Sequence, residues 1–324
     1  MLRRSSFALI PAFVLAATFV GNAQAPAGGA QGQGQGQGQG RGNAPPPAPM
    51  EIKQVKPGLY MVTGMGGNST VRVGNQGIIL VDTKNLGDQF YNDLVAKIKT
   101  VSDQPIKHVF VTHVHQDHSG NIGKFTAAGV EVIAHEGLKR NLETGGPKGT
   151  GYESAAGKPA PPSVTYAKQH KVTLGNISAV AYNFGPGHTG GDTFVHFPDL
   201  RVISLGDHFV AAQPNSDYPM GGSILNWSKS LNEILKLDFD TAIPGHGDNP
   251  LTKADVQAFQ KKLEFIGNKG VELAKKGVPK EEIRQQIQAA GGAELGMWMV
   301  TGIINDARLD MFYADLQAAA KTAK

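Results

Sequence analysis

Short apolar runs separated by polar turns fill the first part of the folded region, and this pattern is typical of β-strands. The runs span 59–63, 69–73 and 77–83, with Gly and Asn in the turns between them. From 86 to about 100 the apolar residues follow helical spacing, and 106–112 returns to a buried-strand pattern. Strands and a helix therefore alternate here.

The same alternation continues downstream and then gives way to helices. A Gly-, Pro- and Ser-rich stretch at 141–165 predicts a long surface loop. The region from 253 to 323 is mostly helical, with breaks at 277–279 and 291–292. The remaining predicted elements are strands at 130–134, 172–174, 178–184, 193–197, 201–204 and 241–243, and a helix at 228–236. This order predicts an α/β layered domain.

The N-terminus resembles an export signal. Arg3 and Arg4 precede an apolar run at 7–20, and Ala23-Gln24-Ala25 offers cleavage after either alanine. The run is shorter than the roughly 20 residues that a membrane-spanning helix needs. We expect a signal peptide at 1–25, a periplasmic or secreted product, and no stable membrane insertion after cleavage. A retained anchor and twin-arginine export are the alternatives.

Composition sets the domain plan and limits the possible chemistry. Gly-Gln repeats and prolines at 26–50 predict a disordered linker, so we expect the folded domain with its helical C-terminal part to span 51–324. The net charge of +4 comes without clusters of Lys, Arg and aromatic residues, so we expect no nucleic-acid partner. Because the chain has no cysteine, any metal must be held by His, carboxylates or water. Nothing in the sequence fixes the oligomeric state.

One short run concentrates side chains that bind divalent metals. His113, His115, Asp117 and His118 occupy four of six positions directly after a predicted strand. Three more candidates fall in loops just past later strands and lie beside glycines: His188, Asp207 and His246. Strand ends at one edge of a sheet converge, so these seven residues can share a site with enough ligands for two metal ions.

The other histidines have simpler explanations. We interpret three of them as surface or strand-face residues: His108, His170 and His196. His135 and His208 lie near the candidate ligands in sequence, but no ligand position requires them, so a role beside the substrate is their alternative. A further interpretation, in which all seven candidate ligands are merely structural, needs seven coincidences at strand ends.

The motifs His113-x-His115-x-Asp117-His118, Gly-His188-Thr-Gly-Gly, Gly-Asp207 and Gly-His246-Gly resemble those of the metallo-β-lactamase superfamily. Val81-Asp82-Thr83 at a strand end matches the early motif of that family. The resemblance covers about 55–250, with all motifs in the family's order. It implies a four-layer αβ/βα sandwich with metals at one edge between two sheets.

The resemblance also implies a ligand set for two Zn²⁺ ions per chain. One ion would be held by His113, His115 and His188, the other by Asp117, His118 and His246, with Asp207 shared and Asp82 supporting them from behind. Flavin-linked di-iron relatives prefer a carboxylate where His115 stands, so zinc is favoured over iron. The best-known secreted β-lactamases of the family carry Cys at the position of Asp207, which leaves antibiotic hydrolysis open.

The expected reaction is hydrolysis of a small lactam, lactone, ester or thioester. Two metal ions would supply a hydroxide to attack the carbonyl carbon, and Asp117 would orient this hydroxide and relay a proton as the catalytic residue. Phosphodiester or sulfate ester hydrolysis on the same fold is an alternative, and so is a zinc-binding accessory protein without turnover. We expect substrate contacts from 141–165 and from the segment between Asp217 and Trp227.

Overall fold

The computed structural model describes residues 48–145, 160–210 and 212–322, and all of them belong to one compact unit that spans 36–324. The predicted signal peptide lies outside the described residues, as does most of the predicted linker. The first strand begins at Glu51, directly after the buried side chain of Met50. No helix in the described ranges has the length and apolar character needed to cross a membrane.

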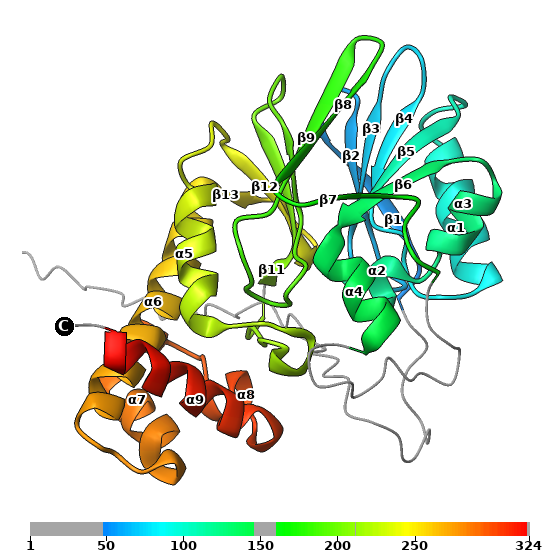
Figure 1. The fold of residues 1–324 in the computed structure, drawn as a ribbon. Helices are drawn as coiled ribbons and strands as arrows, with labels where there is room; N and C mark the ends of the chain where they lie inside the picture. Colours follow the sequence, from blue (N-terminus) through cyan, green and yellow to red (C-terminus); the bar gives the residue numbers. More distant parts are fainter. Residues whose placement is uncertain (1–47, 146–159, 211, 323–324) are drawn as a thin grey trace, which may run out of the picture. The chain divides into compact units, whose positions relative to one another are not determined.

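Two sheets form the centre of this unit (Figure 1). In the first, β1 to β4 pair antiparallel and β4 to β7 parallel, in chain order. Its strands are β1 (Glu51–Lys56), β2 (Leu59–Thr63), β3 (Ser69–Val73), β4 (Ile78–Val81), β5 (Ile106–Val111), β6 (Glu131–His135) and β7 (Val164–Tyr166).

The second sheet is antiparallel except where β11 runs parallel to β12. Its strand order is β13-β12-β11-β10-β9-β8. These strands are β8 (Gln169–Leu174), β9 (Ile177–Tyr182), β10 (Phe194–Phe197), β11 (Val202–Val210), β12 (Thr241–His246) and β13 (Leu251–Thr252).

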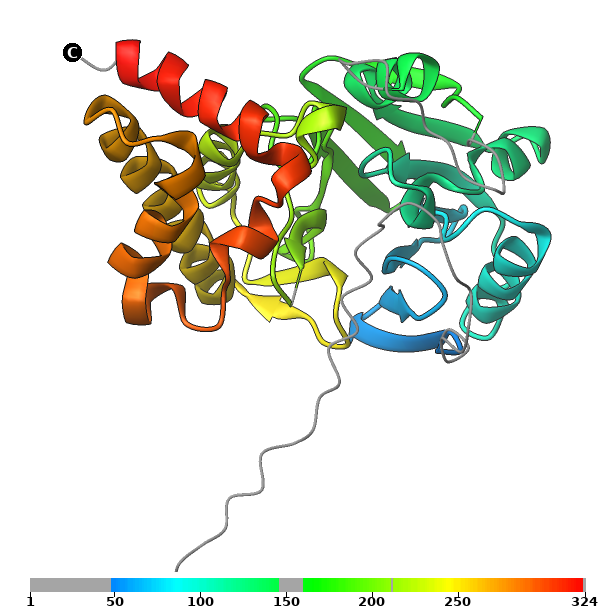
Figure 2. The same cartoon turned by 90° about the horizontal axis from the view of Figure 1, so that it is seen from below.

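Helices cover the outer face of each sheet (Figures 1 and 2). The first sheet packs against α1 (Asp88–Lys99), α3 (Ile122–Ala127) and α4 (Glu136–Thr144), and a short helix, α2 (Gln116–Ser119), lies at its edge. The second sheet is covered by α5 (Ile224–Ile234) and α6 (Lys253–Lys275). The remaining elements pack mainly on helices: α7 (Lys280–Leu295) and α9 (Asp306–Thr322) on α6, α8 (Val300–Ile303) on α7, and the short η1 (Tyr218–Met220) against α9.

Three apolar cores join these layers. One lies between the sheets and includes Phe110 of β5 and Phe197 of β10, both fully buried. The other two fill the spaces between each sheet and its helices. Since both faces of each sheet are covered, central strands such as β11 are buried at nearly every position. The predicted four-layer α/β sandwich is therefore confirmed.

The break predicted at Gly291-Gly292 is confirmed, because the backbone of Gly292, with φ of 42° and ψ of −122°, leaves the helical conformation and kinks α7. Two other local predictions need correction. The stretch 141–165 is not wholly a loop, because α4 continues to Thr144 and β7 begins at Val164; the part at 146–159 lies outside the described residues. The strand predicted to end at Ser204 continues to Val210, because Gly206 with φ of 52° lets β11 bend and keep pairing with β12.

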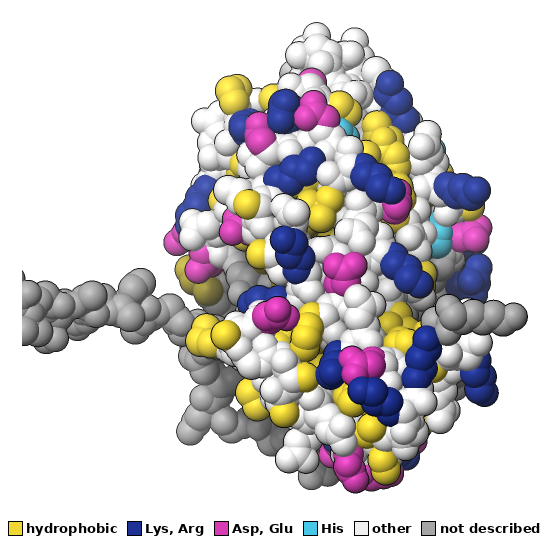
Figure 3. Space-filling model, turned by 90° about the vertical axis from the view of Figure 1, so that its left-hand side faces the viewer, with side chains coloured by type: hydrophobic (Ala, Val, Ile, Leu, Met, Phe, Trp, Pro, Cys, Tyr) yellow, Lys and Arg dark blue, Asp and Glu magenta, His cyan; other side chains and the backbone are white. Residues whose placement is uncertain are grey.

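Basic and acidic side chains are interspersed on the face that lies to the left in Figure 1 (Figure 3). Ion pairs also occur along the helices; Glu272 of α6, for example, pairs with Lys276, the residue directly after this helix. No patch of a single sign stands out on this face. That distribution is typical of a solvated helical surface.

Candidate metal centre

The seven predicted ligands converge at one edge of the two sheets. His113 and His115 follow β5, and His188 follows β9. Asp207 and His246 come from β11 and β12, which the parallel pairing places next to each other. Asp207 lies inside its strand and His246 ends its strand, whereas the sequence placed both just past strand ends.

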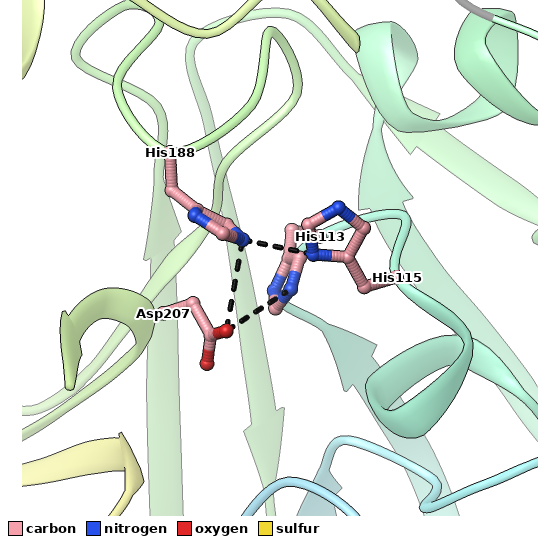
Figure 4. A group of neighbouring side chains, drawn as sticks. All are labelled: His113, His115, His188 and Asp207. Atoms are coloured by element: carbon pink, nitrogen blue, oxygen red, sulfur yellow. Dashed lines mark hydrogen bonds and ion pairs between the residues drawn. The ribbon is translucent and has the colours of Figure 1, made fainter. Parts of the chain in front are cut away.

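The first cluster, called here metal group 1, contains His113, His115, His188 and Asp207 (Figure 4). One ligand atom from each residue lies within 4.8 Å of the others. The His188 Nε2 atom lies 2.9 Å from His115 Nδ1 and 3.6 Å from Asp207 Oδ2. His113 Nε2 lies 3.8 Å from the same Asp207 oxygen. All four side chains point at a common centre.

Hydrogen bonds behind the rings fix which nitrogen of His115 and His188 carries a proton. His115 Nε2 lies 2.8 Å from a carboxylate oxygen of Asp217, so this nitrogen donates. His188 Nδ1 lies 2.6 Å from the backbone carbonyl of Asn215, so it donates as well. In the neutral rings, the nitrogens that face each other across 2.9 Å are therefore both lone pairs. Two lone pairs at this distance repel unless a cation lies between them.

His113 follows the same pattern through Thr112. The Thr112 hydroxyl donates to Asp82 Oδ2 at 2.7 Å and therefore accepts from His113 Nδ1 at 3.0 Å. This leaves His113 Nε2 as a lone pair that is buried and has no hydrogen-bond partner among the described residues. An unpartnered buried atom of this kind needs an explanation, and a bound metal ion provides one.

Metal group 2 contains Asp117, His118 and His246. Asp82 accepts from His118 Nδ1 at 2.7 Å, so in its neutral form the His118 ring also presents a lone pair at Nε2. His246 Nε2 lies 3.3 Å from His118 Nε2 and 3.2 Å from Asp117 Oδ2. The Asp207 carboxylate faces both groups, because its Oδ1 atom lies 3.1 Å from His118 Nε2 while Oδ2 points at metal group 1.

The electrostatics of the two groups differ. In metal group 1, burial together with the neighbouring imidazoles lowers the pKa of His113 well below its usual value and that of His188 to about 4. His115 is the exception in this group, because burial is outweighed by the hydrogen bond to Asp217 together with the charges of the nearby carboxylates, which raise its pKa. Although burial acts in the same direction on His246, the carboxylates of Asp207 and Asp117 raise its pKa to about 10. Metal group 2 thus favours positive charge, whether on imidazole or as a bound cation.

Two glycines are required for this close packing. A Cβ atom on Gly67 would overlap the ring of His118, and one on Gly245 would overlap the carboxylate of Asp207. The β2–β3 turn can therefore lie directly against His118 of metal group 2, and the end of β12 directly against the shared Asp207.

Lys84 is a functional candidate that the sequence analysis missed. Its side chain is fully buried, and Nζ donates to the carbonyls of Val62 at 2.8 Å and Gly67 at 2.7 Å. Gly67 in turn donates from its backbone N–H to the carbonyl of Asp117. Lysine is seldom fully buried, but this one follows the Val81-Asp82-Thr83 motif in an otherwise ordinary surface pattern, so the sequence carries no signal for it.

The segment from Asp217 to Trp227 differs from the expectation. Asp217 holds His115 from behind, and Trp227 is fully buried against the rings of His188 and His208. Neither arrangement is that of a residue facing a substrate. His208 is also buried, with Nε2 3.1 Å from the hydroxyl of Ser230.

The remaining histidines lie outside both groups. His135 accepts from Gly137 at the start of α4 and contacts the Ala167 carbonyl through Nε2. His108 pairs with Glu131, and His196 contacts the carbonyl of Asp238. These contacts agree with the strand-face interpretation of His108 and His196.

A family model described as the metallo-beta-lactamase superfamily matches residues 62–246, more than half of the chain. The chain belongs to the metallo-beta-lactamase superfamily. This confirms the predicted recognition and, at the level of the superfamily, the prediction of a metal-dependent hydrolase. The matched stretch contains every residue of the two metal groups.

Individual relatives carry different names. Metallo-beta-lactamase IND-1 of Chryseobacterium indologenes is 29% identical over 187 residues, covering 56% of this chain and 72% of its own. A metallo-beta-lactamase from Pontibacter korlensis has a similar fold, with a TM-score of 0.56 at 19% identity, covering 66% of this chain and 99% of its own. A double mutant of the sec-alkyl sulfatase PisA1 gives a TM-score of 0.61 at 19% identity, covering 74% of this chain and 45% of its own.

Proposed function

We propose that the protein is a dinuclear zinc hydrolase that cleaves a lactam, lactone or ester. The observation that carries this proposal is the pair of metal groups with the Asp207 carboxylate between them. One ion would be held by His113, His115 and His188, the other by Asp117, His118 and His246, with Asp207 shared. A set of imidazole and carboxylate donors without sulfur suits zinc.

When bound, two such ions supply Lewis acidity and a nucleophilic water at neutral pH. The protein's own contribution is orientation. The outer hydrogen bonds of His115, His188 and His118 fix their tautomers and aim their lone pairs before any ligand arrives.

Asp117 is the residue proposed to handle the proton. Although burial acts to raise its pKa, the charge of His118 and the hydrogen bond to His246 hold that pKa below its usual range, so the carboxylate is ionised. Its side chain is about one-fifth exposed, so it reaches the open side of the centre. It can accept a proton from the attacking water and pass it to the leaving group.

Zinc analysis combined with a substrate panel tests the proposal. We expect two zinc ions per chain, and hydrolysis of a chromogenic cephalosporin, a lactone or a p-nitrophenyl ester that a chelator abolishes and added zinc restores. Asp117→Asn should lower turnover by orders of magnitude with the fold intact. His108→Ala, which removes a histidine outside both groups, should leave turnover unchanged. Full activity in Asp117→Asn, or a protein that takes up no zinc, would refute the assignment.

Sulfate ester hydrolysis is the second candidate. The likeness to the sec-alkyl sulfatase covers more of this chain than the likeness to the Pontibacter β-lactamase, 74% against 66%. A secondary alkyl sulfate therefore belongs in the same panel. If it is turned over and the carbonyl substrates are not, the carbonyl proposal is replaced by this one.

A further inference from the structure

The helix α9 lies beyond residue 246, where the family match ends, and yet it contacts the segment that orients metal group 1. That segment, residues 213–223, is called here the orienting segment. It runs between β11 and α5 and includes η1. Figure 2 shows α9, in red, running beside it.

The orienting segment reaches both imidazoles that face each other in metal group 1. The Asp217 carboxylate accepts from His115, and the Asn215 carbonyl accepts from His188. The segment also holds the backbone around His188, because Asp217 N–H donates to the His188 carbonyl at 2.7 Å and Ser223 N–H donates to the Gly187 carbonyl at 2.9 Å. A shift of this segment would therefore move two ligands together.

The orienting segment contains little regular structure of its own, and α9 supplies part of its support. Asp315 Oδ2 accepts from the Ser223 hydroxyl at 2.7 Å and from the Tyr218 hydroxyl at 3.3 Å. The Tyr218 ring also packs edge-on against Phe312, with centroids 6.3 Å apart. Burial and the charge of Asp315 raise the pKa of Tyr218, so its hydroxyl keeps its proton and remains a donor.

One further contact comes from the same C-terminal part. The backbone N–H of Met299, just before α8, donates to the Gln213 side chain at 2.7 Å. Gln213 begins the orienting segment, so the start of this segment is also held from the C-terminal part.

α9 is itself firmly anchored. Phe312 and Leu316 are fully buried in the core that α9 shares with α6 and α7. A rigid helix that bonds to the orienting segment restricts the positions that its carboxylate and carbonyl can take.

We propose that α9 holds the orienting segment in place for metal group 1 and that Asp315 is a positioning residue for His115 and His188. This inference rests on the proposed metal site. It assigns to the C-terminal helices a role in metal affinity, in addition to their packing.

The test measures zinc affinity by competition with a chromogenic chelator. A His246→Ala background removes a ligand of metal group 2, so that the tightly held ion reports on metal group 1. In it, Asp315→Ala should weaken zinc binding about tenfold, the lower end of the 10–100-fold typical for residues behind metal ligands. Asp315→Asn should restore most of the affinity, because both hydroxyls donate to a single oxygen that an amide can replace.

Controls separate positioning from general destabilisation. Asp310→Ala removes an exposed ion pair with Lys280 from the same helix and should leave zinc affinity unchanged. Tyr218→Phe keeps the ring and loses only the hydroxyl that donates to Asp315, so it should also weaken zinc binding. This variant replaces Asp315→Ala as the test if Asp315→Ala does not fold. Thermal unfolding of each variant is recorded alongside.

Several results would overturn the inference. Wild-type zinc affinity in Asp315→Ala with a lowered melting temperature would mean that α9 only stabilises the fold. Equal losses of zinc affinity in Asp310→Ala and Asp315→Ala would also mean that α9 only stabilises the fold. If the parent protein takes up no zinc, the proposed function itself fails. If the parent protein binds two zinc ions and Asp315→Ala binds the ion of metal group 1 as tightly as the parent, the proposed function stands and only the supporting role of α9 is refuted.

Discussion

Metal group 1 is enclosed by the protein, and hydrogen bonds hold the ring nitrogens that face away from its centre. Metal group 2 is open on one side. In group 1, hydrogen bonds fix the outer nitrogens of His113, His115 and His188. In group 2, the side chain of His246 is 43% exposed, and among the described residues only the outer nitrogen of His118 is seen to be fixed. We infer that group 1 binds its metal more tightly and that water and substrate approach from group 2.

The Asp207 carboxylate faces both groups, so its substitution should affect the two groups alike. Asp207→Ala should reduce the affinity for both ions and lower turnover by at least about 100-fold, since even residues behind metal ligands cost about 10–100-fold. Metal analysis and steady-state kinetics measure this. Loss of one ion only would show that the carboxylate belongs to a single group.

Substitutions of Asp217 and Asp82, whose carboxylates hold the ligand histidines, should give the next largest losses of metal affinity. They should also distinguish metal group 1 from metal group 2. Asp217→Asn should weaken group 1 by about 10–100-fold through His115 alone. Asp82→Asn should affect both groups, because Asp82 contacts His118 directly and reaches His113 through Thr112. Asparagine also tolerates the positive φ of 65° at position 82.

Zinc titrations of the two variants, each compared with the parent protein, make this measurement. A selective loss in Asp217→Asn together with a double loss in Asp82→Asn sharpens the comparison. Identical profiles for the two variants would contradict it.

Lys84 should affect group 2 more than group 1. Lys84→Met leaves two buried carbonyls without their donor, which should lower the free energy of unfolding by about 1–3 kcal/mol. The β2–β3 turn that packs on His118 should loosen, so the more weakly held ion is lost first. Lys171→Met on the exposed face of β8 is the control. Denaturation curves measure the free energy of unfolding, and metal analysis measures the number of zinc ions per chain. A variant that still binds the ion of metal group 2 as the parent does would exclude this role for Lys84.

The smallest effect concerns a histidine outside both groups. Burial lowers the pKa of His196 below its usual value, so below about pH 6.5 the unfolded chain takes up the proton more readily than the folded one. Stability therefore falls as the pH drops through this range, and His196→Gln should make the fall shallower. Denaturation between pH 5 and 7.5, with His108→Gln as control, tests this. Equal slopes in parent and variant would contradict it.

The sequence was sufficient for the sandwich and for bringing the seven candidate ligands together. Strands such as β2 and β3 have the predicted bounds because their apolar runs are flanked by glycine turns. β1 was missed because its residues are largely polar and partly exposed at the edge of the sheet. The length of β11 was underestimated because Gly206 normally marks an end.

The supporting residues could not be predicted, since their roles depend on contacts between distant segments. Asp217 lies 102 positions from His115 in sequence, and nothing near it indicates a histidine partner. Lys84 and Asp315 likewise carry ordinary surface signals in the sequence, and only the folded arrangement gives them partners.

The inward-facing lone pairs have a consequence for the lifetime of the folded chain. Nitrogens aimed at each other, as in His115 and His188, repel when no cation separates them, so the folded state without metal is frustrated. Each bound ion stabilises the fold in proportion to the logarithm of its free concentration relative to its dissociation constant. With the two zinc ions proposed above, the free energy of unfolding would therefore rise with the concentration of free zinc around the protein.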